Sequence, residues 1–324
     1  MNLDTTGKPA PVVSAAWPFV DYAQMMRRLE RPLGSVDVVF DSDTYNEVDD
    51  QYALAYMIRS SEKLKLQALY AAPFFNNRST SPADGMEKSY NEIKNILSLI
   101  NKEDLYDRIY RGSEVYLPSE IEPVISDAAK DLAERAMKYN PEKPLYVIAI
   151  GAITNIASAL LINPDIRDRI VIVWLGGNAF HWHDNREFNL YQDIAAARVV
   201  LGCGAAVILL PCKGVVSAFY VTQPELEYWL AGKNKLCDYL LKTTVDYGKS
   251  RSDYPTWSRA IWDVAAVAWL LDESFMLEHP EHSPIPEYDH IWGHNKTRHM
   301  IKYVYHINRE RLFDDLFRKL VMPV

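Results

Sequence analysis

The sequence predicts an α/β fold with an open, mostly parallel, Rossmann-like sheet that carries helices on both faces. Short runs rich in β-branched residues alternate with amphipathic segments along the chain. The runs are apolar throughout, as expected for parallel strands that are buried on both faces. Strands that alternate with helical segments are typical of βαβ units, which place helices over both faces of a parallel sheet.

Six apolar runs are expected to be strands of this sheet. In chain order they are residues 36–40, 64–72, 145–150, 170–175, 205–210 and 300–307. The segments between and after them are amphipathic, as helices that cover a sheet are. These helices are expected near residues 50–60, 86–101, 125–138, 153–162, 193–202, 223–231, 234–247 and 262–272, and the stretch RERLFDDLFRKL forms a closing helix.

Beyond these elements, the chain has a Pro-rich segment and no sign of a second domain. The Pro-rich stretch HPEHSPIPEYDHIWGHN, residues 279–295, is expected to be a long surface loop that could act as a lid or an oligomer contact. No repeat, low-complexity tract or linker interrupts the chain, and 324 residues can bury one large core. We therefore expect a single domain over residues 1–324, in which about residues 1–35 are an N-terminal extension.

Composition excludes several classes of protein. Apolar residues make up 48% of the chain and charged residues 24%, as in a globular protein. The formal net charge of −8 argues against a nucleic-acid partner, which needs a basic face. No basic-then-apolar leader or bilayer-length apolar run is present, so neither secretion nor a membrane partner is expected. The three cysteines form no CxxC pair and favour reduced thiols in the cytoplasm.

Polar residues follow several of the predicted strands. Asp41 and Asp43 follow the first strand, residues 73–77 follow the second, Gly151 opens the turn after the third, and residues 176–178 follow the fourth. In an open parallel sheet the carboxyl ends of the strands lie at one edge, where ligands bind. These separate segments are therefore expected to converge on one crevice.

The stretch DSDTYNEVDD is the most unusual of these segments. Its four aspartates, Asp41, Asp43, Asp49 and Asp50, lie within ten residues and require a counter-charge. Oxygen-only ligands favour Ca²⁺ or Mg²⁺ over zinc. Alternatively, Asp49 and Asp50 only begin a helix, where acidic residues suit the dipole. Four carboxylates at the end of one strand favour the metal site.

These motifs resemble those of the inosine–uridine preferring nucleoside hydrolase family. DSDTYNEVDDQYAL is similar to its DxDPGxDD motif, and GAITNIASAL, WLGGN, EFNLYQDIAAA, WD with VAAVAWL, and INRERLFDDLFRKL are similar to later family segments. The resemblance runs from about residue 36 to the end. It implies a hydrolase of purine salvage that cleaves the N-glycosidic bond of a small-molecule ribonucleoside, as a homodimer or homotetramer.

The resemblance also implies roles for individual residues. A Ca²⁺ cofactor would be held by the carboxylates and carbonyl that match the family's ligands, namely Asp43, Asp50, Asp263 and the main-chain oxygen of Ile150. Asp49 matches the general base that takes a proton from the attacking water. Glu187 and Asn189 match residues that bind the ribose hydroxyls. Because the reaction passes through an oxocarbenium-like sugar, water must be oriented and positive charge stabilised.

The chain departs from the family pattern at three places. TYNEV, between Asp43 and Asp49, is two residues longer than usual and lacks Pro-Gly, so that Asn46 or Glu47 could enter the pocket. The family's asparagine after the second strand is assigned to Asn76, with Asn77 as the alternative. The asparagine before EFN is assigned to Asn178, with Asn185 as the alternative, although an asparagine at a tight turn is also a turn-former.

The leaving group poses a separate question. Many family members carry a histidine just before the late aspartate, and Trp262 occupies that place here. A tryptophan there resembles the purine-preferring branch, in which aromatic rings stack on the base and favour its protonated form. This interpretation predicts purine ribonucleosides as substrates. The alternative is that Trp262 only packs against the sheet.

Two other functions are compatible with parts of the sequence. FDSDT after an apolar strand also resembles the nucleophile loop of haloacid-dehalogenase-like phosphohydrolases, but no GDxxxD-type motif follows it. The other alternative is a non-catalytic calcium- or sugar-binding pseudoenzyme on the same fold, which the altered aspartate loop permits. Asp49 is retained and favours catalysis.

Overall fold

The computed structural model describes residue 17 and residues 21–323. Its centre is an eight-stranded sheet in the order β3-β2-β1-β4-β5-β6-β12-β9. The strands are β1 Val36–Ser42, β2 Leu64–Ala71, β3 Ile109–Arg111, β4 Leu145–Ala149, β5 Ile170–Leu175, β6 Ala206–Leu210, β9 Met276–His282 and β12 Met300–Ile307. All neighbouring pairs are parallel except β12 with β9. The predicted α/β fold class is confirmed.

The strand order creates a crevice at the centre of the sheet. Reading across β3-β2-β1-β4-β5-β6, the order reverses between β1 and β4, as in doubly wound folds. Connections from β1 and β4 leave on opposite sides of the sheet at this point. The residues that follow β1 and β4 therefore stand beside an opening, and Asp43, in the acidic loop of residues 41–50, lies there.

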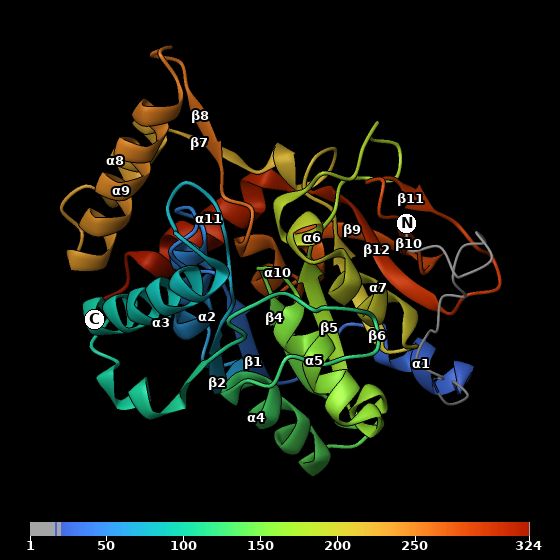
Figure 1. Cartoon of the computed structure of the whole chain (residues 1–324). Helices are drawn as coiled ribbons and strands as arrows, with labels where there is room; N and C mark the ends of the chain where they lie inside the picture. The colour runs from blue at the N-terminus through green and yellow to red at the C-terminus, as the bar shows by residue number, and fades with distance from the viewer. Residues whose placement is uncertain (1–16, 18–20, 324) are drawn as a thin grey trace.

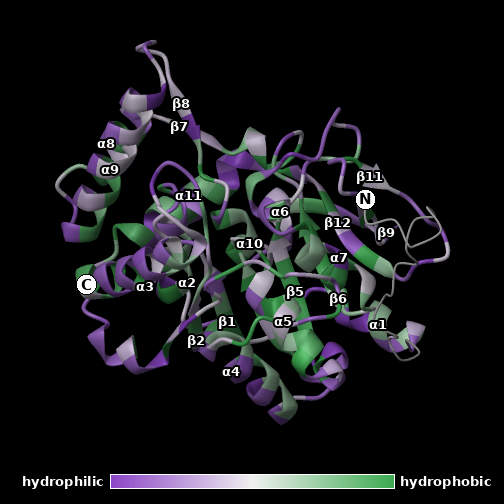
Figure 2. Cartoon of the chain, viewed as in Figure 1, coloured by the Kyte–Doolittle hydropathy of each residue, from purple (hydrophilic) through white to green (hydrophobic). Residues whose placement is uncertain are grey.

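Two hydrophobic clusters lie on the two faces of the sheet. Along β5, Val171 and Val173 belong to one cluster, and Ile172 and Trp174 belong to the other. Successive side chains of a strand point to opposite faces, so both faces of this strand are buried. Figure 2 shows the same strands as a hydrophobic centre inside more polar helices. This double burial explains why the strands are apolar throughout.

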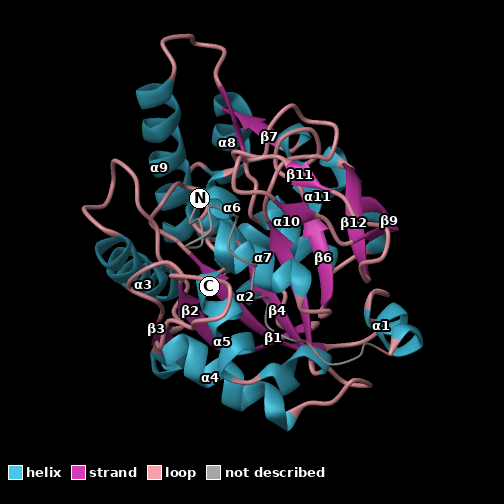
Figure 3. Cartoon of the chain, turned by 45° about the vertical axis from the view of Figure 1, so that its right-hand side comes forward, coloured by secondary structure: helices cyan, strands magenta, loops and turns pink. Residues whose placement is uncertain are grey.

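Helices lie around the central sheet (Figure 3), and their buried residues belong to the two clusters. One cluster includes buried residues of α1 Tyr22–Arg28, α2 Asp50–Arg59, α3 Pro82–Leu99, α10 Val264–Trp269 and α11 Arg309–Leu320. The other includes buried residues of α4 Asp127–Arg135, α5 Thr154–Ile162 and α7 Ile194–Gly202. Side-chain caps begin several of them, such as Ser81 at α3 and Asn308 at α11, whose oxygens accept backbone N–H groups.

A smaller unit stands beside the sheet, at the upper left of Figure 1. It consists of β7 Tyr220–Thr222, α8 Gln223–Leu230, α9 Lys235–Arg251 and β8 Ser258–Ala260, with β7 and β8 paired antiparallel. Thr222 and Glu225 form a reciprocal capping box that starts α8. This unit carries β8 to the end of the sheet where the acidic loop lies.

The structure corrects the expectation of a long surface loop over residues 279–295. Most of β9, together with β10 Ile285–Pro286 and β11 Trp292–Gly293, falls in this segment. β9 is an edge strand, where a residue such as Pro280 is tolerated because one side of the strand has no partner. The helix expected at 262–272 is shorter, and the expected N-terminal extension includes α1, whose Met25 is fully buried.

No helix in the described part of the chain is long and apolar enough to span a bilayer. One further short helix, α6 Phe188–Gln192, follows β5 and precedes α7. It is short because Asp193 ends it and caps α7 with its own side chain. The first turn of α6 faces the crevice, where Phe188 and Asn189 line a pocket.

Candidate active site

A pocket of about 250 Å³ lies at the carboxyl ends of β1, β4, β5 and β6. Its wall is made of residues that follow these strands, together with residues from β8 and from the start of α10. The lining residues are Asp43, Asn46, Glu47, Asp49, Asp50, Ile150, Leu175, Asn178, Arg186, Glu187, Phe188, Asn189, Cys212, Lys213, Arg259, Trp262 and Asp263. The pocket thus occupies the crevice that the strand order creates.

Three buried carboxylates meet in this pocket. One oxygen from each of Asp49, Asp50 and Asp263 lies within 4.8 Å of the other two. Asp49 and Asp263 are the N-cap residues of α2 and α10, and Asp50 is the first residue of α2. The N-termini of two helices therefore point at the cluster, and their partial positive charge favours carboxylates there.

Asp43 and the Ile150 carbonyl lie beside this cluster. The Asp43 carboxylate is buried, and its Oδ2 atom has no hydrogen-bond partner among the described residues. Gly151 leaves room beside the Asp43 carboxylate, because a Cβ atom at that position would lie in tight contact, 3.3 Å from Asp43 Cγ. The carbonyl of Ile150 accepts a hydrogen bond from Asn189 Nδ2 at 3.2 Å.

The crowding of buried carboxylates in this cluster favours a bound cation. Burial, together with the charge of Asp49, raises the pKa of Asp50 to about 7. Burial and the neighbouring carboxylates raise the pKa values of Asp43 and Asp263 well above the ordinary value. Crowded buried carboxylates share this behaviour because each disfavours the charge of the next. The unpartnered oxygen of Asp43 and the all-oxygen donor set fit a hard divalent ion.

Asp41 has a different position from the other three aspartates of its loop. It does not line the pocket, and its Oδ2 accepts a hydrogen bond from Asn155 Nδ2 at 2.8 Å. Burial raises the pKa of Asp41 to about 7. Because Asn155 also bonds Ser113 and the Ala71 carbonyl, this carboxylate belongs to a network that joins β1, β2 and α5.

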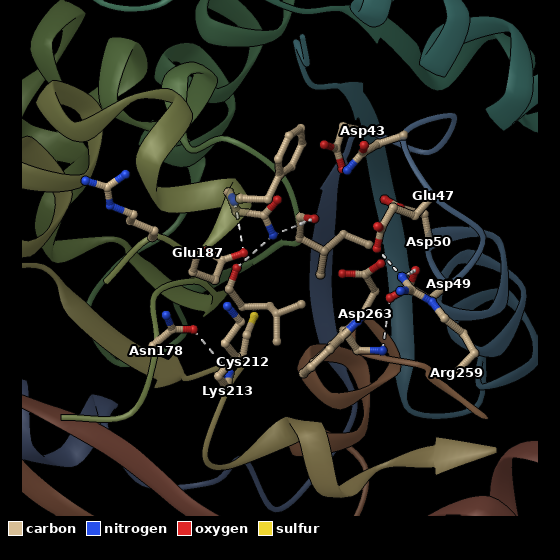
Figure 4. Close-up of a pocket in the computed structure, with 17 residues that line it drawn as sticks. Asp43, Glu47, Asp49, Asp50, Asn178, Glu187, Cys212, Lys213, Arg259 and Asp263 are labelled. Carbon is tan, nitrogen blue, oxygen red and sulfur yellow. Dashed lines mark hydrogen bonds and ion pairs between the residues drawn. The ribbon is translucent and has the colours of Figure 1, made fainter. Parts of the chain in front are cut away.

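Glu187 lies across the pocket from Asp49 and Arg259 (Figure 4), and Asn189 also lines the pocket. Glu187 caps α6, and its carboxylate accepts hydrogen bonds from the backbone N–H groups of Gly177, Asn189 and Leu190 at 2.8–3.0 Å. The Asn189 amide donates to the carbonyls of Ile150 and Leu175. These bonds hold both side chains in fixed orientations. Burial raises the pKa of Glu187, and the three backbone donors oppose that shift.

Of the two assigned asparagines, Asn178 lines the pocket and Asn76 does not. Asn178 lines the pocket, but its amide donates to Asp184 and its Oδ1 accepts the Lys213 N–H, as a turn-former would. The alternative, Asn185, lies outside the pocket lining and accepts the Asn178 N–H. Asn76 also lies outside the lining and donates at 2.6 Å to Asn46, which does line it. The longer loop therefore places Asn46 between Asn76 and the pocket.

The extra residues of the loop also bring Glu47 to the pocket. Glu47 forms an ion pair with Arg259 and accepts a hydrogen bond from the Tyr247 hydroxyl at 2.7 Å. Arg259 Nη2 also donates to Asp49 Oδ1 at 3.1 Å. Burial lowers the pKa of Arg259, but the charges of Asp49 and Glu47 raise it by more. The net pKa is therefore above the ordinary value, and the guanidinium stays charged.

Trp262 is half-buried and lines the pocket three residues after Arg259. Its backbone N–H donates to Asp49 Oδ2 at 3.0 Å. Asp49 therefore accepts one hydrogen bond on each oxygen, from two residues of the same segment. Burial raises the pKa of Asp49, and the charge of Arg259 opposes that shift.

Sequence reasoning did not identify Arg259 or Cys212 as pocket residues. The buried Cys212 thiol lies against Glu187, and burial together with that charge raises its pKa well above the ordinary value. Cys212 follows β6, so its place at a strand end was a usable signal. Arg259 lies in a separate unit and is in no motif, and only its spacing from Trp262 hints at its place.

The chain is similar to known proteins in sequence and in fold. The family model "Inosine-uridine preferring nucleoside hydrolase" matches residues 38–314. "Probable uridine nucleosidase 2" of Arabidopsis thaliana is 29% identical over 135 residues, which cover 40% of this chain and 41% of that protein. "Pyrimidine-specific ribonucleoside hydrolase RihA" of Salmonella newport (strain SL254) is 23% identical over 197 residues, which cover 54% of this chain and 60% of that protein. The chain thus spans less than two thirds of both proteins.

A solved structure has the same fold. "Purine-Preferring Ribonucleoside Hydrolase from Gardnerella vaginalis" superposes with a TM-score of 0.73 at 20% identity. The likeness covers 88% of this chain and 98% of that one. At this identity the likeness concerns the fold, including the sheet that positions the pocket.

Proposed function

The chain belongs to the inosine-uridine preferring nucleoside hydrolase family, and we propose that it hydrolyses the N-glycosidic bond of ribonucleosides to a free base and ribose. One observation carries the proposal. Buried carboxylates from two separate segments, one with Asp43, Asp49 and Asp50 and the other with Asp263, meet the Ile150 carbonyl of a third segment in one pocket. Such an arrangement costs stability unless a ligand compensates it, so it indicates function.

Ca²⁺ is the proposed cofactor. Asp43, Asp50, Asp263 and the Ile150 carbonyl would hold it, because these oxygens line one pocket and Asp43 Oδ2 has no described partner. When bound, a Ca²⁺ ion supplies charge and coordination positions for oxygen atoms. Its affinity for this site would come from the repulsion that it relieves among the carboxylates.

Asp49 is the proposed general base. It accepts hydrogen bonds from Arg259 and from the Trp262 N–H, which fix the plane of its carboxylate. A fixed carboxylate can orient the attacking water and take one of its protons. The neighbouring negative charges of Asp50 and Asp263 also favour positive charge developing on the sugar ring, as glycoside hydrolysis requires.

Glu187 and Asn189 are proposed to bind the ribose hydroxyls, and Asn178 is proposed as a further substrate-binding residue. All three line the pocket, and their orientations are fixed by bonds to backbone groups. Fixed polar groups bind a sugar at a small cost in side-chain entropy. Asn76 would act indirectly, by holding Asn46 at the pocket.

We further propose a preference for purine ribonucleosides, carried by Trp262. Its half-buried position in the pocket wall leaves part of the indole free to stack on a base. Stacking is worth more for a purine, which has the larger ring system. The names of the relatives include uridine, pyrimidine-specific and purine-preferring enzymes, so this preference rests on the pocket.

The expected setting is the cytoplasm, where the enzyme would act in purine salvage as a homodimer or homotetramer. The three cysteines are free and buried, which suits a reducing compartment. Light scattering of the purified protein would give the oligomeric state.

A substrate panel tests the function. Protein supplied with Ca²⁺ would be incubated with inosine, guanosine, uridine and cytidine, and released ribose would be measured with and without chelator. Release that stops with chelator supports the proposal. Binding of nucleosides without release would indicate a pseudoenzyme. The phosphohydrolase alternative is disfavoured because Asp41, the first aspartate of its nucleophile loop, lies outside the pocket lining.

A further inference from the structure

We propose that Arg259 is a catalytic residue, whose guanidinium binds the departing base and stabilises the negative charge that develops on it. This inference rests on the proposed nucleoside hydrolysis and extends it to the leaving group. The class of base is one with carbonyl and nitrogen acceptors on one edge, such as a 6-oxopurine.

Arg259 is held rigidly in the pocket wall. Its side chain is only 16% exposed, and Nη2 contacts the carboxylates of Glu47 and Asp49. The guanidinium also lies over the ring of Tyr247, with its central carbon 5.0 Å from the ring centroid. A guanidinium fixed by two carboxylates and an aromatic face keeps its charge and its direction.

At least one donor of this guanidinium is left over. The Nε atom of Arg259 is buried and has no hydrogen-bond partner among the described residues. A buried N–H without an acceptor costs free energy, and functional sites are where such groups persist. Arg259 therefore has an uncommitted donor in addition to the Nη2 atom that binds Glu47 and Asp49.

The layout of the pocket places the base on the Arg259 side. Figure 4 shows Glu187, Asn178 and Lys213 on one side, Arg259 and Glu47 on the other, and Asp263 between them. A ribose bound at Glu187, with its reacting carbon near the central carboxylates, directs its base toward Arg259. Trp262, three residues further along the same segment, can then meet the face of the base while Arg259 meets its edge.

The leaving base needs such a partner. Among the described residues that line the pocket there is no histidine, and the other two cations, Arg186 and Lys213, are exposed. Both forks of a guanidinium include Nη2, which binds Glu47 and Asp49 here, so a donor outside Nη2 would meet a single acceptor on the edge of an oxopurine, such as its carbonyl or a ring nitrogen. A preorganised donor at a developing charge is typically worth about 10²–10³ in rate.

Arg259 stays protonated throughout the proposed step. The bond from the sugar carbon to the base nitrogen breaks, and its electron pair goes to the base. The oxygen of the attacking water forms the new bond to the sugar carbon, and Asp49 takes one water proton. Arg259 keeps its own proton and donates hydrogen bonds to the base, which takes up a proton from solvent as it departs.

A leaving-group comparison tests the proposal. Arg259→Gln and the unmodified enzyme, both supplied with Ca²⁺, would be assayed on inosine and on 4-nitrophenyl β-ribofuranoside, whose phenolate leaves without such help. We expect kcat/KM to fall on both substrates, because Arg259 also orients Asp49, and to fall about 100-fold more on inosine than on the nitrophenyl riboside. Arg251→Gln is the matched control, because Arg251 also lies over the Tyr247 ring but does not line the pocket.

The other outcomes are decisive. Equal losses on both substrates would overturn the proposal, because Arg259 would then act only through Asp49 or through the fold. An unchanged rate on inosine would also overturn it. If Arg259→Gln does not fold by circular dichroism, Arg259→Lys replaces it and should show the same substrate difference to a smaller degree. Failure of the unmodified enzyme on both substrates would instead overturn the proposed function.

Discussion

The guanidinium of Arg259 lies 3.1 Å from the carboxylate of Asp49, although 210 positions separate the two residues in the chain. The contact joins β8, outside the main sheet, to the first turn of α2 at the sheet's central crevice. Because Asp49 also accepts the Trp262 N–H, one segment determines the orientation of this carboxylate. The small unit that carries β8 is therefore part of the catalytic apparatus in our proposal.

Replacement of Asp49 should abolish most activity while preserving the fold. Asp49→Asn keeps the shape of the side chain but removes the basic oxygen, so kcat should fall by about 10²–10⁴. Asp272→Asn is the control, because Asp272 is also a helix N-cap but lies outside the pocket lining. A near-normal kcat for Asp49→Asn would move the base elsewhere, and Glu47 in the same wall would be the next residue to replace.

Removal of the metal should destabilise the protein as well as inactivate it. The carboxylates of Asp43, Asp50 and Asp263 are buried in one pocket, so a cation that binds only the folded state adds to the free energy of unfolding. Ca²⁺ at a hundred times its Kd would add about 2.7 kcal/mol. Thermal melting with EGTA and then with excess Ca²⁺ measures this effect.

Two variants make the metal experiment specific. Asp43→Asn should weaken the response of the melting temperature to Ca²⁺, since it removes a proposed ligand. Asp314→Asn, at an exposed ion pair with Arg318, should leave the response unchanged. Full activity in protein shown by metal analysis to be free of calcium would contradict the proposed cofactor.

Much of the sheet could be predicted because its strands are buried on both faces. The apolar runs at 170–175 and 300–307 coincide with β5 Ile170–Leu175 and β12 Met300–Ile307. β9 Met276–His282 could not be found in this way, because it is an edge strand of mostly polar residues. Its pairing with β12 depends on backbone hydrogen bonds, which leave no side-chain pattern in the sequence.

The acidic part of the site was visible for a similar reason. Asp43, Asp49 and Asp50 lie in one short stretch, so their charge density shows in the sequence, and all three line the pocket. The residues that contact the longer loop between Asp43 and Asp49 could not be predicted from the sequence. Arg259 acquires its place only through contacts with Glu47 and Asp49 in the folded chain, and no local pattern records such contacts.

Trp262 should determine the preference between bases. If its indole stacks on a purine, the unmodified enzyme should hydrolyse inosine and guanosine faster than uridine. Trp262→Phe should then lower inosine turnover modestly, and Trp262→Ala severely, with Ca²⁺ still bound. Trp229→Phe is a control at a half-buried tryptophan outside the pocket lining. Hydrolysis of uridine as fast as inosine by the unmodified enzyme would count decisively against a purine preference.

Gly177 should not tolerate a side chain, both because its φ is positive and because a Cβ atom there would clash with Trp292. Its φ is +72°, and a Cβ atom would lie 2.4 Å from Trp292 Cζ2. Its N–H also donates to Glu187. Gly177→Ala should therefore lower stability by more than the cost of about 1–3 kcal/mol for positive φ alone, and it should raise KM.

Gly232→Ala isolates the backbone contribution. Gly232 has a φ of +68°, and no atom lies within 4 Å of the position that a Cβ atom would occupy there. Gly232 also lies outside the pocket lining, so its replacement should leave KM unchanged. Its loss of stability, measured by urea denaturation, gives the cost of positive φ without a clash. If both variants lose the same stability and keep the same KM, the contact of Gly177 with Trp292 and Glu187 has no consequence.

His299 should make the protein less stable in mild acid. Burial, with the charges of Arg298 and Arg167, lowers the pKa of His299 to about 4. Between pH 6.5 and 4 the unfolded chain therefore binds a proton at this residue that the folded chain does not, so the free energy of unfolding falls as pH falls. By pH 5 this loss is about 2 kcal/mol. His299→Gln should remove that part of the difference between urea denaturation at pH 7.5 and at pH 5, whereas His294→Gln is the control for replacing an exposed histidine. The same pH dependence in His299→Gln and in the unmodified protein would show that His299 is protonated in the folded state or that another group causes the loss.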